Sequence, residues 1–325
     1  MQNQIKIWRL IQQSIQENIP VMLLYVLESN GSSPGRQGFF MALDAIGKME
    51  GSIGGGIMEH KFVEMAKVKL QHNKELSTVR KQMHDKSAAN NQSGMICSGE
   101  QTVFIYKVQV HEFIAINQII KCLEQDRNGV LELSKNGISF KEAKQEKIFY
   151  YTFKSLNDWL YSETIGYINH LYVIGAGHCA LALCKIMSML NFYIHLYDDR
   201  PELKTFEENS FVQHKTFVAD YNQLTQLLHS DENSYVVVMT FGYRTDDIAL
   251  RTLLNKRFKY LGLLGSKKKI EKMFTDYELE GISKESLLKI HAPVGMDIHS
   301  QTPEEIAVSI AAEIIAVKNG VALRR

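Results

Sequence analysis

The sequence has 325 residues, of which 45% are hydrophobic and 22% are charged, and this size and composition are typical of a globular protein with two domains. The 37 Lys and Arg residues and the 36 Asp and Glu residues nearly cancel, and the net charge at pH 7 is +1. The balance argues against a polyanionic partner, and we expect no nucleic acid partner.

The first twenty residues predict a helix. Ile5, Trp8, Ile11 and Ile15 follow helical spacing among glutamines, and the stretch lacks the apolar core of a signal peptide. No apolar run in the sequence approaches the roughly 20 residues that cross a bilayer. We therefore expect a cytoplasmic protein without a membrane partner.

Residues 20–106 alternate strand-like runs with glycine turns, and a helix is expected from near Ile57. The strand-like runs are VMLLYVLES, FFMALDAIGKMEG and TVFIYKVQV. A polar stretch, residues 81–93, is expected to be a loop. The pattern indicates an α+β domain over residues 1–155. A linker with edge elements is expected between residues 149 and 170.

A different rhythm begins after the linker and predicts a second domain over residues 165–325. HLYVIGAGHCALALCKIMSMLNFYIHLYDDR reads as strand, glycine turn, helix and strand, which is the βαβ unit of a parallel sheet. HKTFVA, YVVVMTF and KYLGLLG are further strand-like runs. The predicted fold class is α/β, with a C-terminal Rossmann-like, doubly wound parallel sheet and an N-terminal α+β domain.

The glycine turn of this βαβ unit has the dinucleotide-binding pattern G-x-G-x-x-A. Gly175, Gly177 and Ala180 follow the first strand, and Asp198 ends the next one. The glycines allow a pyrophosphate to approach the helix N-terminus, and Asp198 could accept a hydrogen bond from a ribose hydroxyl. His178 lies within the turn and is expected to face the ligand crevice. Alternatively, the domain keeps this fold and binds another phosphate, or no ligand.

A second strand-to-helix turn carries Gly265, Ser266 and Lys267, which could meet a phosphate group. A solvated basic helix face explains the lysine nearly as well.

Thr240 follows a further strand at its carboxyl end, which is the ligand-facing edge of such a sheet. Arg244, Asp246 and Asp247 come directly after it, and one of these aspartates is expected to cap the following helix.

The last helix has explicit start and stop signals. Thr302, Pro303 and Glu305 form a capping box with proline at the first helical position, and Asn319 and Gly320 end the helix. Its middle is apolar on most faces, so it should be buried against the sheet or against another copy of the chain. The expected assembly is a homodimer.

Seven segments in this order resemble the xanthine dehydrogenase accessory proteins of the XdhC/CoxI type, from about Val21 to Gly320. The segments are GSSPGRQG, GSIGGGIMEHK, MICSGEQTVFIY, YVIGAGHCALALCKI, YDDRPE, YLGLLGSKKKIEKM and APVGMDIHSQTPEEIAVSIAAEIIAVKNG. The resemblance implies a cytoplasmic accessory protein with a C-terminal Rossmann domain. Such a protein binds molybdenum cofactor, protects it during sulfuration and passes it to a molybdenum hydroxylase such as xanthine dehydrogenase. A cysteine desulfurase would be a second partner.

The stretch GSIGGGIMEHKF, residues 51–62, places four glycines directly before a helix, although glycine is the residue most costly to order. With the resemblance, Gly54, Gly55 and Gly56 would let the chain approach the phosphate end of the cofactor, and Glu59 would contact the pterin. The alternative is a strained turn that serves packing within the domain.

Cys97 is the other candidate in the first domain. The family pattern has Cys-Gly-Gly where this chain has Cys97, Ser98 and Gly99. A thiolate is a soft ligand, so the resemblance makes Cys97 the expected contact to the molybdenum cofactor, although free cysteines are more often buried and inert. The remaining cysteines lie on apolar helical stretches and are expected to be buried and reduced: Cys122, Cys179 and Cys184.

The chain departs from the family at the crevice edge, where Thr240-Phe241 replaces Thr-His. The alternative function is an NAD(P)-dependent oxidoreductase that uses the C-terminal domain. No Cys-His or Ser-His pair at a recognisable spacing occurs in the first domain, and no site for a hydride-accepting substrate can be assigned. Binding and delivery of the cofactor is therefore the preferred hypothesis.

Overall fold

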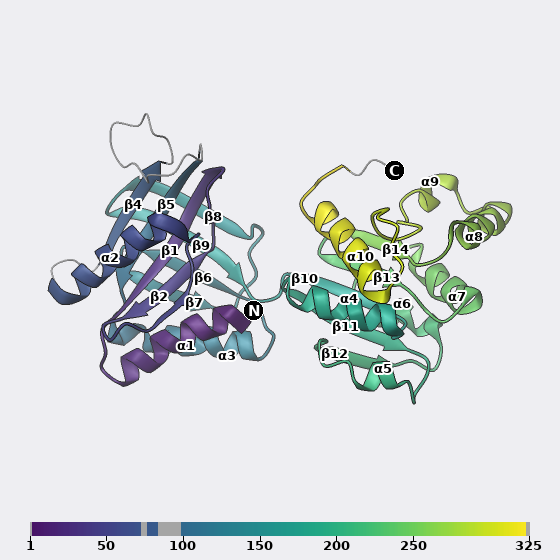
Figure 1. Ribbon diagram of the computed structural model, residues 1–325, viewed down its shortest axis with the longest axis horizontal. Helices are drawn as coiled ribbons and strands as arrows, with labels where there is room; N and C mark the ends of the chain where they lie inside the picture. The colour runs from purple at the N-terminus through teal and green to yellow at the C-terminus, as the bar shows by residue number, and fades with distance from the viewer. Residues whose placement is uncertain (1, 73–76, 84–98, 323–325) are drawn as a thin grey trace. The chain divides into compact units, whose positions relative to one another are not determined.

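The computed structural model describes residues 2–72, 77–83 and 99–322. Its two compact units are Met1–Gly166 and Tyr167–Arg325 (Figure 1). Strands β8 (Phe149–Ser155) and β9 (Asp158–Ile165) pair with each other in the first unit. The segment expected to be a linker therefore contributes a hairpin to the first unit.

The first unit contains a five-stranded antiparallel sheet in the order β3-β2-β1-β5-β4. The strands are β1 (Val21–Gly31), β2 (Phe40–Asp44), β3 (Met49–Gly51), β4 (Ser77–Met83) and β5 (Gly99–Lys107). Helices α1 (Gln2–Gln16) and α2 (Gly56–His72) pack on opposite faces of this sheet. The strands and the helix expected between residues 20 and 106 are thus present.

Strand β1 is apolar without alternation because both of its faces are covered. Leu23 and Tyr25 pack in the cluster that includes α1, whereas Met22 and Leu24 pack in the cluster that includes α2. All four side chains are at most 1% exposed. The central position of β1 therefore accounts for the run VMLLYVL.

A four-stranded antiparallel sheet in the order β7-β6-β9-β8 completes the first unit. Its other strands are β6 (Gly129–Ser134) and β7 (Gly137–Lys141), and η1 (Val110–Glu112) and α3 (Phe113–Glu124) precede them. Aromatic side chains join the two sheets: the ring centroids of Phe104 and Trp159 lie 4.9 Å apart. Such pairs add packing specificity to the apolar area that the sheets bury.

The second unit is built on a five-stranded parallel sheet in the order β12-β11-β10-β13-β14. The strands are β10 (Asn169–Ile174), β11 (Phe192–Asp198), β12 (His214–Phe217), β13 (Ser234–Val238) and β14 (Tyr260–Leu263). The strand order reverses between β10 and β13, and this reversal is where doubly wound sheets bind ligands.

Helices cover both faces of the parallel sheet (Figure 1). One face packs against α4 (His178–Ser188) and α10 (Pro303–Lys318), and the other against α7 (Tyr243–Leu253) and α8 (Lys267–Leu279). The shorter elements are α5 (Lys204–Glu207), η2 (Tyr221–Gln223), α6 (Leu224–Leu227) and α9 (Lys284–Leu287). The predicted fold class is confirmed.

Helix α10 has the capping box that the sequence predicts. The Thr302 side chain accepts a hydrogen bond from the Glu305 backbone, and the Glu305 carboxylate accepts one from the Thr302 backbone. Ile310 and Ile314 are fully buried in the core that α10 shares with α4 and the sheet. Its apolar middle is therefore explained within one chain. None of the described helices has the length and apolar character needed to cross a bilayer.

Candidate functional site

The glycine loop between β3 and α2 packs backbone against backbone. Gly54, Gly55 and Gly56 have φ values of +127°, +73° and +70°, which favour glycine. A Cβ on Gly54 would collide with the backbone of Gly35, and a Cβ on Gly35 would collide with the Ile53 carbonyl. The side of Gly55 is open, with no atom within 4 Å of where its Cβ would lie. Close approach and positive φ together account for the glycine run.

The carboxylate of Glu59 fills the inside of this loop. Its Oε2 accepts hydrogen bonds from the backbone nitrogens of Ile53 at 2.8 Å and Gly55 at 3.0 Å. It also accepts one from the Ser52 hydroxyl at 2.6 Å. The loop therefore binds an anion that is a side chain of the same chain. The pterin contact expected of Glu59 stays a prediction, and it would require Oε2 to leave these three bonds.

Gln101 links the glycine loop to the loop at residues 31–38, a role that the sequence pattern did not predict. Its side chain accepts a hydrogen bond from the Ser33 hydroxyl and donates one to the Ile53 carbonyl, both at 2.9 Å. Gln101 is 1% exposed. The sequence feature that could have indicated this role is a polar residue directly before the apolar run TVFIY. The loops at residues 31–38 and 52–56 thus form one rigid cluster at an end of the sheet.

Cys97 lies outside the described residues, so its proposed contact to the molybdenum cofactor stays a prediction. Cys122 and Cys184 are fully buried, and Cys179 is partly buried. Burial raises the pKa of all three thiols, that of Cys184 to about 12. A thiol with a raised pKa is a poor nucleophile and metal ligand at neutral pH, which fits the inert role expected of these three.

The turn after β10 presents a helix N-terminus. Gly175 has φ +102°, and a Cβ there would collide with the Met239 carbonyl next to β13. Gly177 is the N-cap of α4, has no side-chain cap and has no atom within 4 Å on its Cβ side. His178, the next residue, is exposed. The turn can therefore offer uncapped backbone N–H groups and the positive end of α4 to an anion.

Asp198 is already engaged by protein groups. It is fully buried and accepts hydrogen bonds from the Ala176 nitrogen at 2.6 Å and from the Arg200 guanidinium at 2.8 Å on each oxygen. The Arg200 backbone adds a bond of 2.9 Å. The carboxylate raises the pKa of Arg200 further above its usual range. Asp198 is therefore placed beside the turn, as predicted, but a ribose hydroxyl could reach it only if Arg200 moved.

Thr240 and a buried ion pair lie at the carboxyl end of the neighbouring strand β13. The Thr240 nitrogen and hydroxyl donate to Asp246 Oδ1 at 2.9 and 2.6 Å, and Lys269 contacts Asp246 Oδ2. Asp246 is fully buried. The helix cap expected from an aspartate is wrong, because α7 begins earlier and Gly242 is its N-cap. Asp246 instead joins α7 and α8 to the end of β13.

Gly265 and Ser266 lie at the start of α8. The Ser266 side chain caps this helix by accepting a hydrogen bond from the Lys269 nitrogen, and Lys267 is exposed to solvent. Lys269 binds the Leu264 carbonyl at 3.2 Å, which links this turn to the Asp246 cluster.

Five of the residues singled out in the second unit lie at one edge of its sheet. Gly175, Gly177, Asp198, Thr240 and Gly265 surround the carboxyl edge of the parallel sheet. Within the described ranges, no group of three or more His, Cys, Asp or Glu side chains could hold a metal ion. The second unit thus offers the open, uncapped N-terminus of α4 to an anionic group.

Comparisons with known proteins agree with this architecture. The family model of the XdhC Rossmann domain matches residues 171–314, and that of the XdhC and CoxI family matches residues 14–80. A crystal structure of a xanthine dehydrogenase from Bacillus halodurans has a TM-score of 0.71 and 20% identity over 96% of each chain, and so shares the fold.

One of two sequence relatives covers nearly the whole chain, and the other covers about half of it. The uncharacterized protein YqeB of Escherichia coli (strain K12) is 26% identical over 311 residues, which are 94% of this chain and 44% of the relative. A Bacillus subtilis (strain 168) protein, named as a probable subunit of xanthine dehydrogenase, is 27% identical over 154 residues, which are 47% of this chain and 44% of the relative. The match thus spans less than half the length of each relative. With both units matched, the chain belongs to the XdhC and CoxI family.

Proposed function

We propose that the protein binds molybdenum cofactor and delivers it to a molybdenum hydroxylase such as xanthine dehydrogenase, which assists maturation of that enzyme. One observation carries the proposal: models of the XdhC and CoxI family match in both units, residues 14–80 and 171–314. The relative named as a probable subunit of xanthine dehydrogenase supports this choice of client. Sulfuration of the cofactor with a cysteine desulfurase, and action as a homodimer, belong to the same proposal.

The start of α4 supports binding of the anionic end of this cargo. Molybdopterin ends in a phosphate, or in a pyrophosphate when a nucleotide is attached. Gly177 leaves the α4 N-terminus uncapped and open, whereas Ser266 caps α8 and Glu59 fills the glycine loop before α2. Among these turns, that of α4 therefore fits a phosphate without rearrangement. An anion at Gly54–Gly56 would first have to displace Glu59.

A delivery protein acts through the difference between its own affinity for the cofactor and the affinity of the client enzyme. The cargo must bind the carrier more weakly than the client, or leave when the client docks. The proposal therefore assigns no catalytic residue, and it keeps Cys97 as the thiolate that contacts the molybdenum centre.

An NAD(P)-dependent oxidoreductase is the second candidate, because the α4 turn would also hold a dinucleotide pyrophosphate. The position of Arg200 speaks against a simple NAD site, since its guanidinium covers the Asp198 carboxylate that would bind the ribose. Titration with NADH and NADPH separates the two candidates. Saturable binding of either together with substrate-dependent oxidation favours the oxidoreductase.

Substitution at Gly177 tests the delivery function. Gly177→Asp should stabilise α4, because aspartate is a good N-cap and the site has φ −69° and open space. Its carboxylate would occupy the anion position and repel a phosphate. Gly177→Ser is the matched control, which adds a cap without charge.

The measured quantity is activity regained by cofactor-free xanthine dehydrogenase after incubation with each carrier loaded with molybdenum cofactor. We expect Gly177→Asp to lower cofactor retention and transfer about tenfold or more, with an unchanged or raised melting temperature, and Gly177→Ser to lower them much less. Transfer by Gly177→Asp equal to that of the unsubstituted carrier would show that the α4 N-terminus does not hold the cofactor. No transfer by any carrier would contradict the delivery function.

A further inference from the structure

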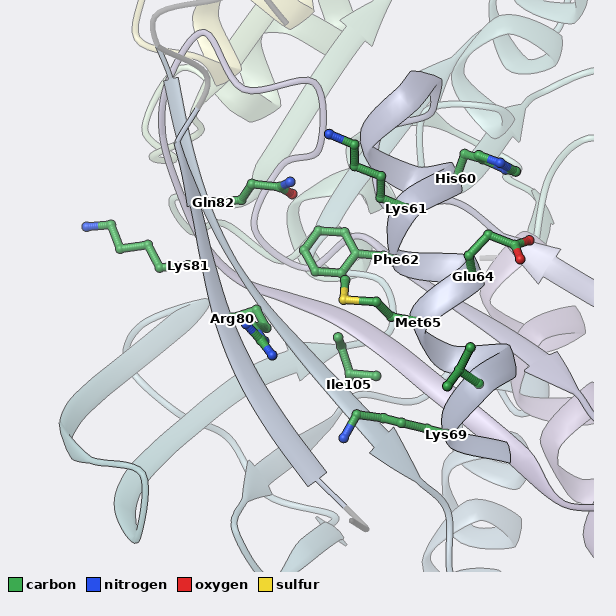
Figure 2. A pocket seen from close by; sticks show the side chains of 11 residues that line it. His60, Lys61, Phe62, Glu64, Met65, Lys69, Arg80, Lys81, Gln82 and Ile105 are labelled. Carbon is green, nitrogen blue, oxygen red and sulfur yellow. The ribbon is translucent and has the colours of Figure 1, made fainter. Parts of the chain in front are cut away.

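A groove of about 690 Å³ lies between α2 and strands β4 and β5 of the first unit (Figure 2). Phe62 and Met65 project from α2 toward the strands, and Ile105 comes from β5. Phe62 and Ile105 are at most 1% exposed, so Met65 and Val68 of α2 provide the accessible apolar surface of the groove above them. Its volume lies within the range of pockets that bind small organic molecules.

One buried polar atom in this groove lacks a partner. Gln82 is 9% exposed, and its Oε1 makes no hydrogen bond within the described part of the chain. Its side chain points from β4 toward α2 (Figure 2). A buried acceptor without a donor destabilises the folded state, so such atoms are rare in native proteins. An N–H or O–H group of a ligand would satisfy it.

The rim of the groove is positively charged. Arg80 comes from β4 and Lys69 and Lys61 come from α2, whereas Glu64 is the acidic lining residue. Arg80 makes no ion pair or hydrogen bond within the described ranges. Glu64 is paired with Lys67 at 2.8 Å. The charge of the rim therefore favours an anionic ligand.

Lys81 provides an internal contrast. It follows Arg80 on β4 and points to the other side of the strand in Figure 2, where its amine pairs with Glu100 at 2.8 Å. Both residues line the groove, but the Lys81 amine points away from it and is held in a surface ion pair, whereas Arg80 has no such partner among the described residues.

We propose that this groove binds a planar heterocycle that carries an N–H donor and an anionic group. The flat body would lie on Met65 and Val68, the donor would bind Gln82 Oε1, and Arg80 would pair with the anionic group. Both purine nucleotides and anionic pterins have this chemistry. The groove is lined by residues of the first unit and the α4 turn belongs to the second. The assignment rests on the groove residues alone and does not require that the protein delivers the cofactor.

Two probes distinguish these sources. The full-length chain is titrated with guanosine 5′-monophosphate by calorimetry and with pterin-6-carboxylate by fluorescence anisotropy. The uncharged analogues guanosine and pterin are the ligand controls. We expect saturable binding of at least one anionic probe, at least tenfold tighter than that of its uncharged analogue. The tighter of the two probes identifies the source of the ligand.

Three variants locate the binding. Arg80→Met should weaken binding about tenfold, and Gln82→Leu about fivefold to tenfold, which corresponds to the loss of one charge-assisted and one ordinary hydrogen bond. Gln82→Leu should leave the melting temperature unchanged or raise it, because it removes an unsatisfied acceptor. Lys81→Met, the matched control, should change the affinity less than twofold.

Different outcomes would overturn the assignment. Absence of saturable binding of both anionic probes up to about 1 mM, a concentration that corresponds to only about 4 kcal/mol of binding free energy, would show that the groove does not bind this class. Equal effects of Arg80→Met and Lys81→Met would show that the probes bind by general charge. Unchanged affinity in both Arg80→Met and Gln82→Leu would place the probes elsewhere. None of these results affects the transfer assay with Gly177 variants.

Discussion

Glu163 makes the stability of the first unit depend on pH near neutrality. It lies on β9, where the hydroxyls of Tyr25 and Tyr161 donate hydrogen bonds to its Oε2 at 2.5 and 2.7 Å. Burial raises the pKa of Glu163 from 4.5 to about 7, although the two tyrosine hydrogen bonds act in the opposite direction. Glu163 has no cation partner among the described residues, and a buried carboxylate in that situation is expected to have a raised pKa.

The unfolded and folded pKa values of Glu163 set the sign and the size of the pH dependence. Because the folded pKa is above the unfolded one, the folded state holds its proton more tightly, and the free energy of unfolding is highest below pH 4.5. It falls as the pH rises to about 7 and is constant above that. A difference of about 2.5 in pKa corresponds to about 3 kcal/mol.

The substitution Glu163→Gln removes this titration while keeping an acceptor for the tyrosines. Urea unfolding of both proteins between pH 5 and pH 8, followed by tryptophan fluorescence, measures the effect. Trp8 and Trp159 are the two tryptophans of the chain and both lie in the first unit, so the signal reports on that unit. We expect the variant to gain about 2–3 kcal/mol relative to the unsubstituted protein as the pH rises from 5 to 8.

The exposed Glu146 provides the control. Glu146→Gln should leave the pH dependence of the unsubstituted protein in place. If Glu163→Gln and the unsubstituted protein lose the same free energy of unfolding between pH 5 and pH 8, the carboxylate is charged at little cost, and the reasoning from its burial is refuted.

Three other substitutions test the glycine loop and the buried ion pair. Gly54→Ala should destabilise the first unit by about 2 kcal/mol or more in urea unfolding, and Gly55→Ala by about 1 kcal/mol, because both have positive φ but only Gly54 also packs against backbone. Equal losses of stability would contradict the packing argument. Glu59→Gln should speed hydrogen exchange of the Gly55 amide about tenfold, since the bond loses its charge, and unchanged exchange would refute the Glu59 cap. Lys269→Met should destabilise the second unit by about 3–5 kcal/mol in thermal unfolding, because the buried Asp246 carboxylate loses its cation. A loss below about 1 kcal/mol would show that this ion pair contributes little to stability.

Local signals made much of the fold predictable. The capping box of Thr302 and Glu305 lies within four residues, and the turn at Gly175 lies between a short strand and its helix. Each of these signals needs only neighbouring residues. The parallel sheet then followed from the repeated order of strand, turn and helix.

Features that depend on residues distant in the sequence could not be predicted. Strands β8 and β9 have few apolar residues in a row, and β9 joins the sheet by pairing with β6, which precedes β7 and β8 in the sequence. Residues 149–165 therefore resembled a linker with edge elements. The sequence predicted that Glu59 and Asp198 lie at glycine turns. It did not show that each carboxylate is already bonded, because Ser52 and Arg200 have no fixed spacing in such motifs.

The molybdenum and pterin content of the chain tests the central claim most directly. The full-length protein is purified from a host that makes molybdenum cofactor and is analysed for metal by mass spectrometry and for pterin by fluorescence after oxidation. The delivery function predicts molybdenum and pterin in about equal amounts, both much reduced in Gly177→Asp and retained in Gly177→Ser. Metal and pterin at the background level in all three proteins would contradict it.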